Sequence, residues 1–259
     1  MAPPRTYRCE AIILSYTPLG EADLLVTMFT REQGKVRAVG KGARRSTSKL
    51  VGHLEPLTVV RMSMAHGRSM DIISQAEVVQ SFAGLKEDLT AITKGLYLAE
   101  LVDGFGSEAS ANPDLFQLTL DSLRAVQADP SSDMPLRSFE FHLLQVSGLM
   151  PELYHCVECR QELEPGAHRF SPNVGGTLCP DCNPDDAHLR PLSLRALKVL
   201  RLFDRSSITE ACKLSVDGSL AEELKSLLST TVGYWLGKEI RSNSFLECLH
   251  KESLPEVYI

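Results

Sequence analysis

The sequence predicts an α+β protein of several domains, in which a five-stranded barrel precedes an all-α domain that is interrupted by a four-cysteine ribbon. Three observations lead to this fold class. The first 80 residues alternate like short strands between turns, apolar residues recur at helical spacing from residue 85, and two Cys-x-x-Cys units stand in a segment rich in proline and glycine. A chain of 259 residues with 43% hydrophobic residues can form one large domain or two smaller ones.

The first 80 residues are expected to form a small barrel. Segments rich in Ile, Leu, Val and Thr are separated by turns such as Arg31-Glu-Gln-Gly34. The expected strands are residues 8–16, 23–30, 35–41, 57–65 and 70–79. An OB-fold is a five-stranded Greek-key barrel of this size. An SH3-like barrel would give a similar pattern, so strand spacing alone leaves both topologies open.

Residues 81–152 and 188–259 are expected to form the helical domain. The spacing of three and four places one set of apolar residues on a single helix face: Leu85, Leu89, Ile92, Leu96 and Ala99. Asn112-Pro113 begins a second helix, with Asn as the cap and Pro in the first turn. Its inward face is Phe116, Leu120 and Leu123.

Three more helices are expected further along the chain. Pro135 opens one whose inward residues are Leu136, Phe139, Leu143 and Val146. Residues 193–203 form another. Ser219-Leu-Ala-Glu222 has the form of a capping box and begins a third. The apolar face expected on that last helix is Leu220, Leu224, Leu227, Thr231 and Trp235.

Residues 153–187 are expected to be a metal ribbon inserted in the helical domain. Cys156-Val-Glu-Cys159 and Cys179-Pro-Asp-Cys182 are separated by 19 residues, a spacing typical of a four-cysteine zinc site. Four thiolates close the tetrahedron and leave no position for water, so we expect one structural zinc ion. Two disulfides, or four buried thiols without a metal, are the alternatives. The other cysteines, Cys9, Cys212 and Cys248, are scattered.

Charge divides the chain unequally. Residues 1–80 carry 11 Lys and Arg against 7 Asp and Glu, a net of +4, whereas residues 81–259 carry 16 against 26, a net of −10. The two parts together give the overall net charge of −6. This asymmetry indicates a basic binding module attached to an acidic body.

The basic residues gather in one stretch of the expected barrel. It contains one acid, Glu32, and seven cations: Arg31, Lys35, Arg37, Lys41, Arg44, Arg45 and Lys49. On a strand, Lys35, Arg37 and Lys41 share one side, while Val36 and Ala38 face the core. We expect this stretch to bind nucleic-acid phosphates. The alternative is a solvated strand edge whose cations only prevent aggregation.

Other chemistries find little support in the sequence. Gly34 and Gly40-Lys41 are one residue too far apart for a phosphate-binding Walker loop, and no GxGxxG motif follows. Neither cysteine pair has the preceding proline of the P-C-x-x-C motif that a zinc deaminase would require, since Leu178 precedes Cys179. Tyr7, Tyr16 and Phe29 are expected to be core or structural residues rather than base platforms. We therefore expect a protein that is not an enzyme; a zinc hydrolase would need an open metal position.

The compartment is expected to be the cytoplasm, in association with the nucleoid. The N-terminus lacks the apolar run of a signal peptide. No stretch reaches the roughly 18 consecutive apolar residues of a membrane span.

The chain resembles the RecO family of bacterial recombination mediators over nearly its whole length. The elements that carry the resemblance follow in a consistent order. They are Gly20-Glu-Ala-Asp-Leu-Leu25, Phe29-Thr30 with Gly34-Lys35, Gly40-Lys-Gly-Ala-Arg-Arg45, Leu98-Ala-Glu-Leu101, Leu115-Phe116, Arg137-Ser-Phe-Glu140 with Leu143-Leu144, Gly148 with Pro151, the cysteine pairs and Gly175-Gly176.

The resemblance implies an N-terminal OB-fold, a helical C-terminal domain and a zinc ribbon. It also implies binding of single- and double-stranded DNA, annealing of complementary strands, and help to RecA in displacing single-strand binding protein (SSB), with RecR as partner. The acidic SSB tail ends in an apolar residue and docks on the family's helical domain, for which Lys198, Arg201 and Arg241 are the candidate cations here. The alternative function is a protein-docking adaptor with incidental DNA affinity.

Overall fold

The computed structural model describes residues 5–238, 240–242 and 246. Contacts between Cα atoms divide the chain into two compact units, Met1–Pro130 with Arg241–Ile259 and Ser131–Ile240. The barrel lies in the first unit, and the four clustered cysteines lie in the second. The expected domain boundaries at residues 80, 152 and 187 follow changes of secondary structure instead, and they stay a prediction.

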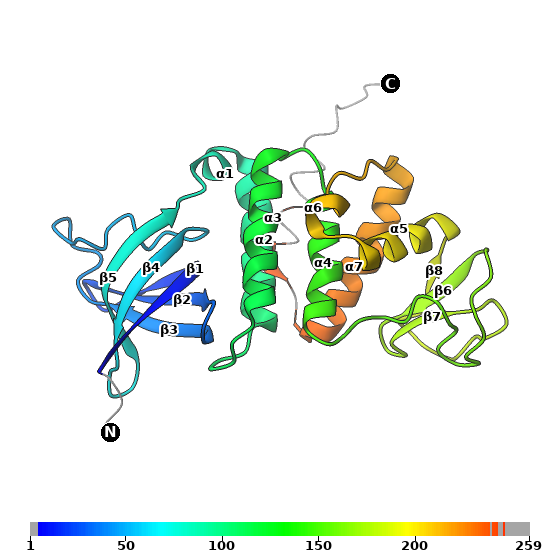
Figure 1. Ribbon diagram of the computed structural model, residues 1–259, viewed down its shortest axis with the longest axis horizontal. Coiled ribbons are helices and arrows are strands. Elements are labelled where there is room, and N and C mark those ends of the chain that lie inside the picture. The colour runs from blue at the N-terminus through cyan, green and yellow to red at the C-terminus, as the bar shows by residue number, and fades with distance from the viewer. Residues whose placement is uncertain (1–4, 239, 243–245, 247–259) are drawn as a thin grey trace. The chain divides into compact units, whose positions relative to one another are not determined.

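Five strands close into a barrel in the order β1-β2-β3-β5-β4, with β1 paired to β4 (Figure 1). All pairs are antiparallel except β3 and β5, which run parallel through Ala38–Asp71 and Val39–Ile72. The prediction of an OB-like five-stranded barrel is confirmed. The strands are β1 (Thr6–Leu19), β2 (Asp23–Thr30), β3 (Gly34–Gly40), β4 (Val59–Ala65) and β5 (Asp71–Gln80).

Alternation along the strands fills the barrel interior. Ala11, Ile13, Val26 and Met28 point inward and are fully buried in one apolar cluster with Ala38. The long loop between β3 and β4 adds Ala43, Leu50 and Leu54 to the same cluster. These apolar anchors hold the loop that carries most of the predicted DNA-binding cations.

A helix covers part of the outer surface of the barrel. α2 (Leu89–Phe105) packs against β1 and β2. Ile12 and Phe29 are cross-strand partners on the outer side, yet both are completely buried. A Cβ atom on Gly106, just after α2, would lie 2.9 Å from the Phe29 ring, which leaves room only for glycine. This end of the β1–β2–β3 surface is therefore closed by protein.

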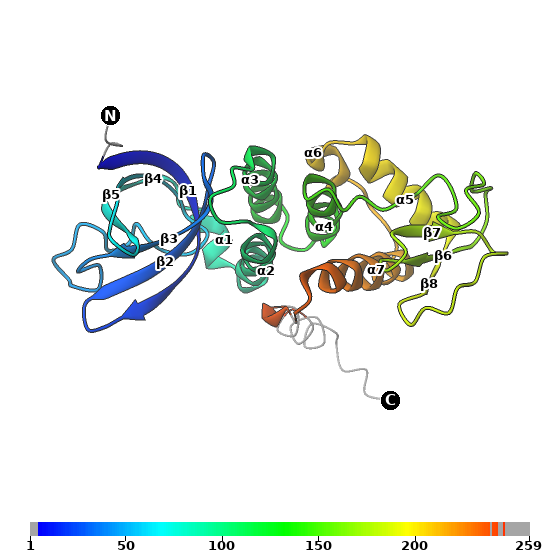
Figure 2. The ribbon, with the colours of Figure 1, turned by 90° about the horizontal axis from the view of Figure 1, so that it is seen from below.

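The remaining helices of the first unit are α1 (Ala83–Glu87) and α3 (Pro113–Ala128), and α3 lies beside α2 in Figure 1 and Figure 2. Asn112 caps α3 as predicted, accepting the Leu115 N–H at 2.9 Å. The predicted single face through Leu85 and Leu89 is wrong. Asp88 is extended and separates α1 from α2, which shifts the helical phase and leaves Leu89 60% and Leu96 40% exposed.

The helices of the second unit surround an apolar core that includes Phe141, Leu197, Phe203 and Leu224. Ser193 caps its helix by accepting the Ala196 N–H at 3.1 Å. Ile240 ends this unit. The helices are α4 (Met134–Val146), α5 (Leu194–Arg205), α6 (Ile208–Ala211) and α7 (Gly218–Leu236).

Two predictions about the start and face of α7 are wrong. The helix begins earlier than Ser219, because Asp217 is the cap and accepts the Leu220 N–H at 3.1 Å. A capping box does form, but in α6, between Ser207 and Glu210. Trp235 is 42% exposed instead of buried, near the end of the helix.

The ribbon is a small sheet of order β7-β6-β8 attached to the second unit. Its strands are β6 (His168–Ser171), β7 (Gly176–Leu178) and β8 (Arg190–Leu192). Glu152 extends the β7 edge: its N–H donates to Gly175 O at 3.0 Å and its carbonyl accepts from Thr177 N at 2.9 Å. Within the described residues, no helix combines the length and apolar character needed to span a membrane.

Candidate nucleic-acid interface and metal centre

Four sulfur atoms meet in the ribbon. The ligand atoms of Cys156, Cys159, Cys179 and Cys182 all lie within 4.8 Å of one another, and the Cys159 and Cys179 Sγ atoms are 3.8 Å apart. Zinc–sulfur bonds of about 2.3 Å in a tetrahedron hold two sulfurs about 3.8 Å apart, so this separation suits a bound ion. All four cysteines are free of disulfides. The arrangement confirms the predicted cluster and fits a metal rather than two disulfides.

The backbone shapes both cysteine turns. Arg160 adopts a left-handed conformation (φ 64°), and its N–H donates to Cys156 O at 2.9 Å to close the first turn. Arg169 braces the second turn by donating from Nη1 to Pro180 O at 2.9 Å and Cys182 O at 3.1 Å. His155 is not part of the cluster, since its Nδ1 lies 3.7 Å from Glu152 Oε1.

Hydrogen bonds favour thiolate at one of the four positions. Burial alone would raise the pKa of Cys156, but N–H groups of Cys179, Cys159 and Glu158 donate to its sulfur and lower the pKa to about 6. Burial and the neighbouring sulfurs raise the pKa of Cys182 above its ordinary value. Four adjacent thiolates repel one another, and a divalent cation at their centre would remove that repulsion.

Two of the predicted DNA-binding cations are engaged inside the first unit. The Lys35 Nζ donates to Asp103 O at 2.6 Å and lies 3.4 Å from Asp103 Oδ1. The Arg31 guanidinium lies 4.6 Å from the centre of the Phe116 ring and pairs with Glu10 at 3.7 Å. Both side chains therefore hold the barrel and the helices together, in addition to any role at the surface.

Four other predicted cations lie on β3 and the loop after it. Arg37 is about half exposed, with Nε 4.0 Å from Glu108 Oε1, and Lys41 and Arg45 are exposed. The exposed Arg44 donates from Nη1 to the carbonyls of Gly20 and Glu21, both at 3.2 Å, and so connects this loop to the β1–β2 turn. We call Arg37, Lys41, Arg44 and Arg45 the β3 cation surface.

The strand surface beside Arg37 is open and polar. Ser15, Thr27 and Arg37 form one cross-strand row, and Thr17, Leu25 and Val39 form the next. Ser15, Thr17 and Arg37 are exposed, and the other three are half-buried. In OB-folds, the surface of strands 2 and 3 with the adjoining loops binds oligonucleotides. The β3 cation surface lies at this position.

Lys49 lies apart from the β3 cation surface, in a hollow of about 590 Å³ whose lining also includes Arg8 and Arg61. The sequence analysis did not single out these two arginines, because they are isolated along the chain. The alternation of side chains along a strand was the available signal that both arginines point outward. Arg8 precedes the buried Cys9, and Arg61 lies between the buried Val60 and Met62.

The aromatic residues of the barrel differ in exposure. Phe29 is fully buried, as expected for a core residue. The Tyr7 hydroxyl donates to Asp71 Oδ2 at 2.6 Å. The pKa of Tyr7 is raised above its ordinary value, mainly by burial and also by this hydrogen bond. Tyr16 is 44% exposed, so it is not a core residue, and its expected structural role stays a prediction. Its cross-strand partner is the buried Val26, and it lies where β1 runs on past the barrel toward the β1–β2 turn.

The predicted tail-binding cations fall in different units. Lys198 and Arg201 lie on α5, where Arg201 Nε donates to Leu153 O at 2.9 Å and its guanidinium lies 4.9 Å from the Tyr154 ring centre. Arg241 belongs to the first unit, and its N–H donates to Glu100.

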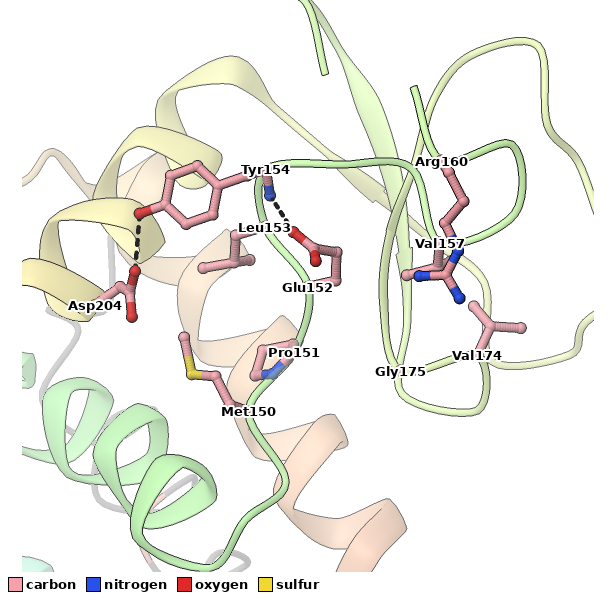
Figure 3. Close-up of a pocket in the computed structure, with 10 residues that line it drawn as sticks. All are labelled: Met150, Pro151, Glu152, Leu153, Tyr154, Val157, Arg160, Val174, Gly175 and Asp204. Carbon is pink, nitrogen blue, oxygen red and sulfur yellow. Dashed lines mark hydrogen bonds between the residues drawn. The ribbon is translucent and has the colours of Figure 1, made fainter. Parts of the chain in front are cut away.

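A cavity of about 380 Å³ lies beside α5 (Figure 3). Met150, Leu153, Tyr154 and Val174 give it apolar walls, and Arg160 lies at its rim in the figure. The Tyr154 hydroxyl donates to Asp204 Oδ2 at 2.8 Å and fixes the ring against α5. Arg205 also stacks on this ring, 5.3 Å from its centre. The cavity therefore has apolar walls and nearby cations, but polar groups make up most of its surface and include the carboxylates of Glu152 and Asp204.

Two family models together match most of the chain. The family model described as "Recombination protein O N terminal" matches residues 1–82, and "Recombination protein O C terminal" matches residues 86–244. A protein of Roseiflexus sp. named DNA repair protein RecO is 39% identical over 94% of this chain and 86% of its own length. A protein of the same name from Dehalococcoides mccartyi is 33% identical over 98% of this chain and 100% of its own length. Another from Desulforamulus reducens is 34% identical over 96% of this chain and 97% of its own length. The chain belongs to the RecO family.

Proposed function

We propose that this protein is a non-enzymatic recombination mediator in DNA repair. It binds single- and double-stranded DNA, anneals complementary strands, and helps load RecA onto DNA coated with SSB. Family membership supports the assignment to DNA repair, and the barrel supports DNA binding. The protein acts in the cytoplasm on the nucleoid.

The β3 cation surface is the observation that carries this function. Arg37, Lys41 and Arg45 extend from an OB-like barrel at the position where such barrels bind oligonucleotides. Exposed hydroxyls of Ser15 and Thr17 supply further donors beside them. Contacts of this kind go to phosphates, which explains binding without sequence preference and tolerance of both single and double strands.

The partner surface is proposed to be on the second unit. An acidic tail with an apolar last residue needs an apolar pocket next to cations. The cavity beside α5 has Tyr154 and Leu153 as walls, and Lys198, Arg201 and Arg205 lie on the adjoining helix. Glu152 and Asp204 also line it, so the cations of α5 must outweigh these two carboxylates. We assign SSB-tail binding to this place, with RecR as a further partner and RecA as an indirect one. Arg241 remains a candidate on the other unit.

One structural zinc ion is proposed for the ribbon. Cys156, Cys159, Cys179 and Cys182 would hold it, and Arg169 would keep the second turn in its binding geometry. The ion would supply structural cross-linking, since four thiolates leave no open coordination position. Cys159 and its neighbours lie far in sequence from the β3 cation surface, so DNA binding is assigned to the barrel and not to the metal.

The alternative is an adaptor that docks proteins through the acidic part of the chain and touches DNA incidentally. Lys35 and Arg31 contact other residues of the same chain, which favours this alternative because fewer cations remain for phosphates. The two functions differ in one measurable property. The DNA affinity of a mediator falls steeply with salt, because its barrel cations bind phosphates. The incidental DNA affinity of an adaptor depends little on those cations.

Charge reversal at Arg44 and Arg45 tests the proposed function. The full-length double variant Arg44→Glu/Arg45→Glu should bind a fluorescent single strand more weakly than the natural protein. Its slope of log affinity against log salt should shrink by about 1.4, since each lost phosphate contact on single strands removes about 0.7. Lys213→Glu/Arg190→Glu is the control, because both residues are exposed cations of the second unit. Equal affinity and slope in both variants would remove the β3 cation surface from the site.

A further inference from the structure

The hollow around Lys49 is a second cationic site on the barrel. Its volume is about 590 Å³, which lies within the range of about 300–1,000 Å³ typical of small-ligand pockets. Three exposed cations from three parts of the barrel line it: Arg8 from β1, Arg61 from β4 and Lys49 from the β3–β4 loop. Segments distant in sequence thus bring positive charge to one hollow.

These cations are not used by the fold. In the part of the chain that the structure describes, neither Arg8, Arg61 nor Lys49 has a hydrogen-bond or ion-pair partner for its side chain. Arg31 and Lys35, by contrast, are both engaged with protein groups. Three such cations around a hollow with one acid in its lining are suited to an anionic ligand.

The rest of the lining suits a nucleotide rather than a simple anion. Ser63 and Gln75 are cross-strand partners that add polar groups beside Arg8. The half-buried Ala76 adds a small apolar surface, which a free phosphate does not need and a base does. Glu77 is the one acid in the lining. The lining therefore has three cationic groups and one anionic group.

The hollow and the β3 cation surface involve different strands. The hollow is lined from β1, β4, β5 and the β3–β4 loop, and β2 and β3 contribute no residue to it. Arg37 instead shares a row with Thr27 of β2 and Ser15 of β1. A single barrel therefore has two separate cationic surfaces.

We propose that the hollow lined by Arg8, Lys49 and Arg61 binds a second DNA strand, while the β3 cation surface holds the first. Phosphates would lie against the three cations and an unpaired base against Ala76. This proposal rests on the proposed function of DNA binding and deepens it. Two strands held on one barrel are at a high effective concentration relative to each other, which accelerates annealing without any base-specific contact.

Native mass spectrometry of the full chain with oligothymidylate tests the proposal. Strands of about eight nucleotides fall within the length that one OB barrel binds, and identical strands cannot pair with each other. At saturation the natural protein should carry two strands per chain. Arg8→Glu/Arg61→Glu should carry one, and so should Arg44→Glu/Arg45→Glu; Lys213→Glu/Arg190→Glu should carry two.

The outcomes separate the two proposals. A natural protein that never exceeds one strand per chain, or an Arg8→Glu/Arg61→Glu variant that still carries two, would overturn the second site and leave the first intact. A natural protein that binds no strand would remove the proposed function itself. Retention of one strand by Arg8→Glu/Arg61→Glu also shows that its barrel is folded. The milder Arg8→Gln/Arg61→Gln should give the same loss of one strand.

Discussion

Lys35 and Asp103 join β3 to α2. The lysine Nζ donates to the main-chain oxygen of Asp103 at 2.6 Å and lies 3.4 Å from its carboxylate, and the lysine side chain is only 14% exposed. A residue at the centre of the basic stretch therefore secures the helix against the barrel. This engagement separates cations that stabilise the fold from cations that remain available to DNA.

Replacing Lys35 should affect stability more than DNA binding. Lys35→Met keeps the apolar stem but removes a charged hydrogen bond, which should lower the free energy of unfolding by about 1.5–3 kcal/mol. Urea denaturation measures this loss. Arg37→Met, at an exposed position of the same strand, should change stability by less than about 0.5 kcal/mol but weaken binding to a single strand. The reverse pattern would contradict the separation of roles.

The β2–β3 turn should tolerate no side chain at Gly34. Gly34 and Gly20 both have positive φ values, 70° and 61°, so both should lose about 1–2 kcal/mol on mutation to Ala. A Cβ atom at Gly34 would also lie 2.7 Å from Ser107 O and closer still to Ser110 O. A Cβ atom at Gly20 would have no other heavy atom within 4 Å. This crowding should cost Gly34→Ala about 1–3 kcal/mol more than Gly20→Ala. Equal melting temperatures of the two variants would contradict it.

The ribbon should depend on its metal, and the barrel should not. Native mass spectrometry of the natural protein should show one zinc ion per chain. Cys156→Ser should lose the zinc and make residues 153–187 sensitive to protease, with little change in affinity for a single strand. Cys212→Ala serves as the control, since this cysteine lies outside the cluster. Metal-free natural protein with a protease-resistant ribbon would disprove the zinc assignment.

Binding of an acidic peptide should depend on α5. A fluorescent acidic peptide with an apolar last residue should bind the natural protein, and the same peptide without that residue should bind weakly. Lys198→Glu should reduce the affinity several-fold, because it reverses an exposed charge on α5, the helix that contributes Asp204 to the cavity. Lys213→Glu should not. Equal anisotropy curves for the two variants would exclude α5 as the tail site.

Much of the fold could be predicted because local patterns agree with the tertiary structure. Strand alternation located the barrel, and paired Cys-x-x-Cys spacing located the cysteine cluster, since each such turn presents two sulfurs to one point. The helix that begins after Asn112 followed from its cap. The face of α2 did not follow, because a single extended residue, Asp88, resets the helical phase and no periodicity reveals it.

The site was less predictable than the fold. The seven cations are close in sequence, but their partners come from elsewhere: Asp103 for Lys35 and Phe116 for Arg31. Arg8 and Arg61 meet Lys49 only because β1 pairs with β4 and the β3–β4 loop returns to the barrel. Which cations gather in one place is a property of strand pairing, and strand pairing is not encoded in a short window of sequence.

Strand annealing tests the central claim most directly. The rate at which two complementary single strands pair should be measured by loss of donor fluorescence, with and without SSB coating the strands. The natural protein should accelerate pairing in both cases, and Arg44→Glu/Arg45→Glu should abolish most of the acceleration while Lys213→Glu/Arg190→Glu retains it. No acceleration by the natural protein, or full acceleration by the Arg44→Glu/Arg45→Glu variant, would contradict the account.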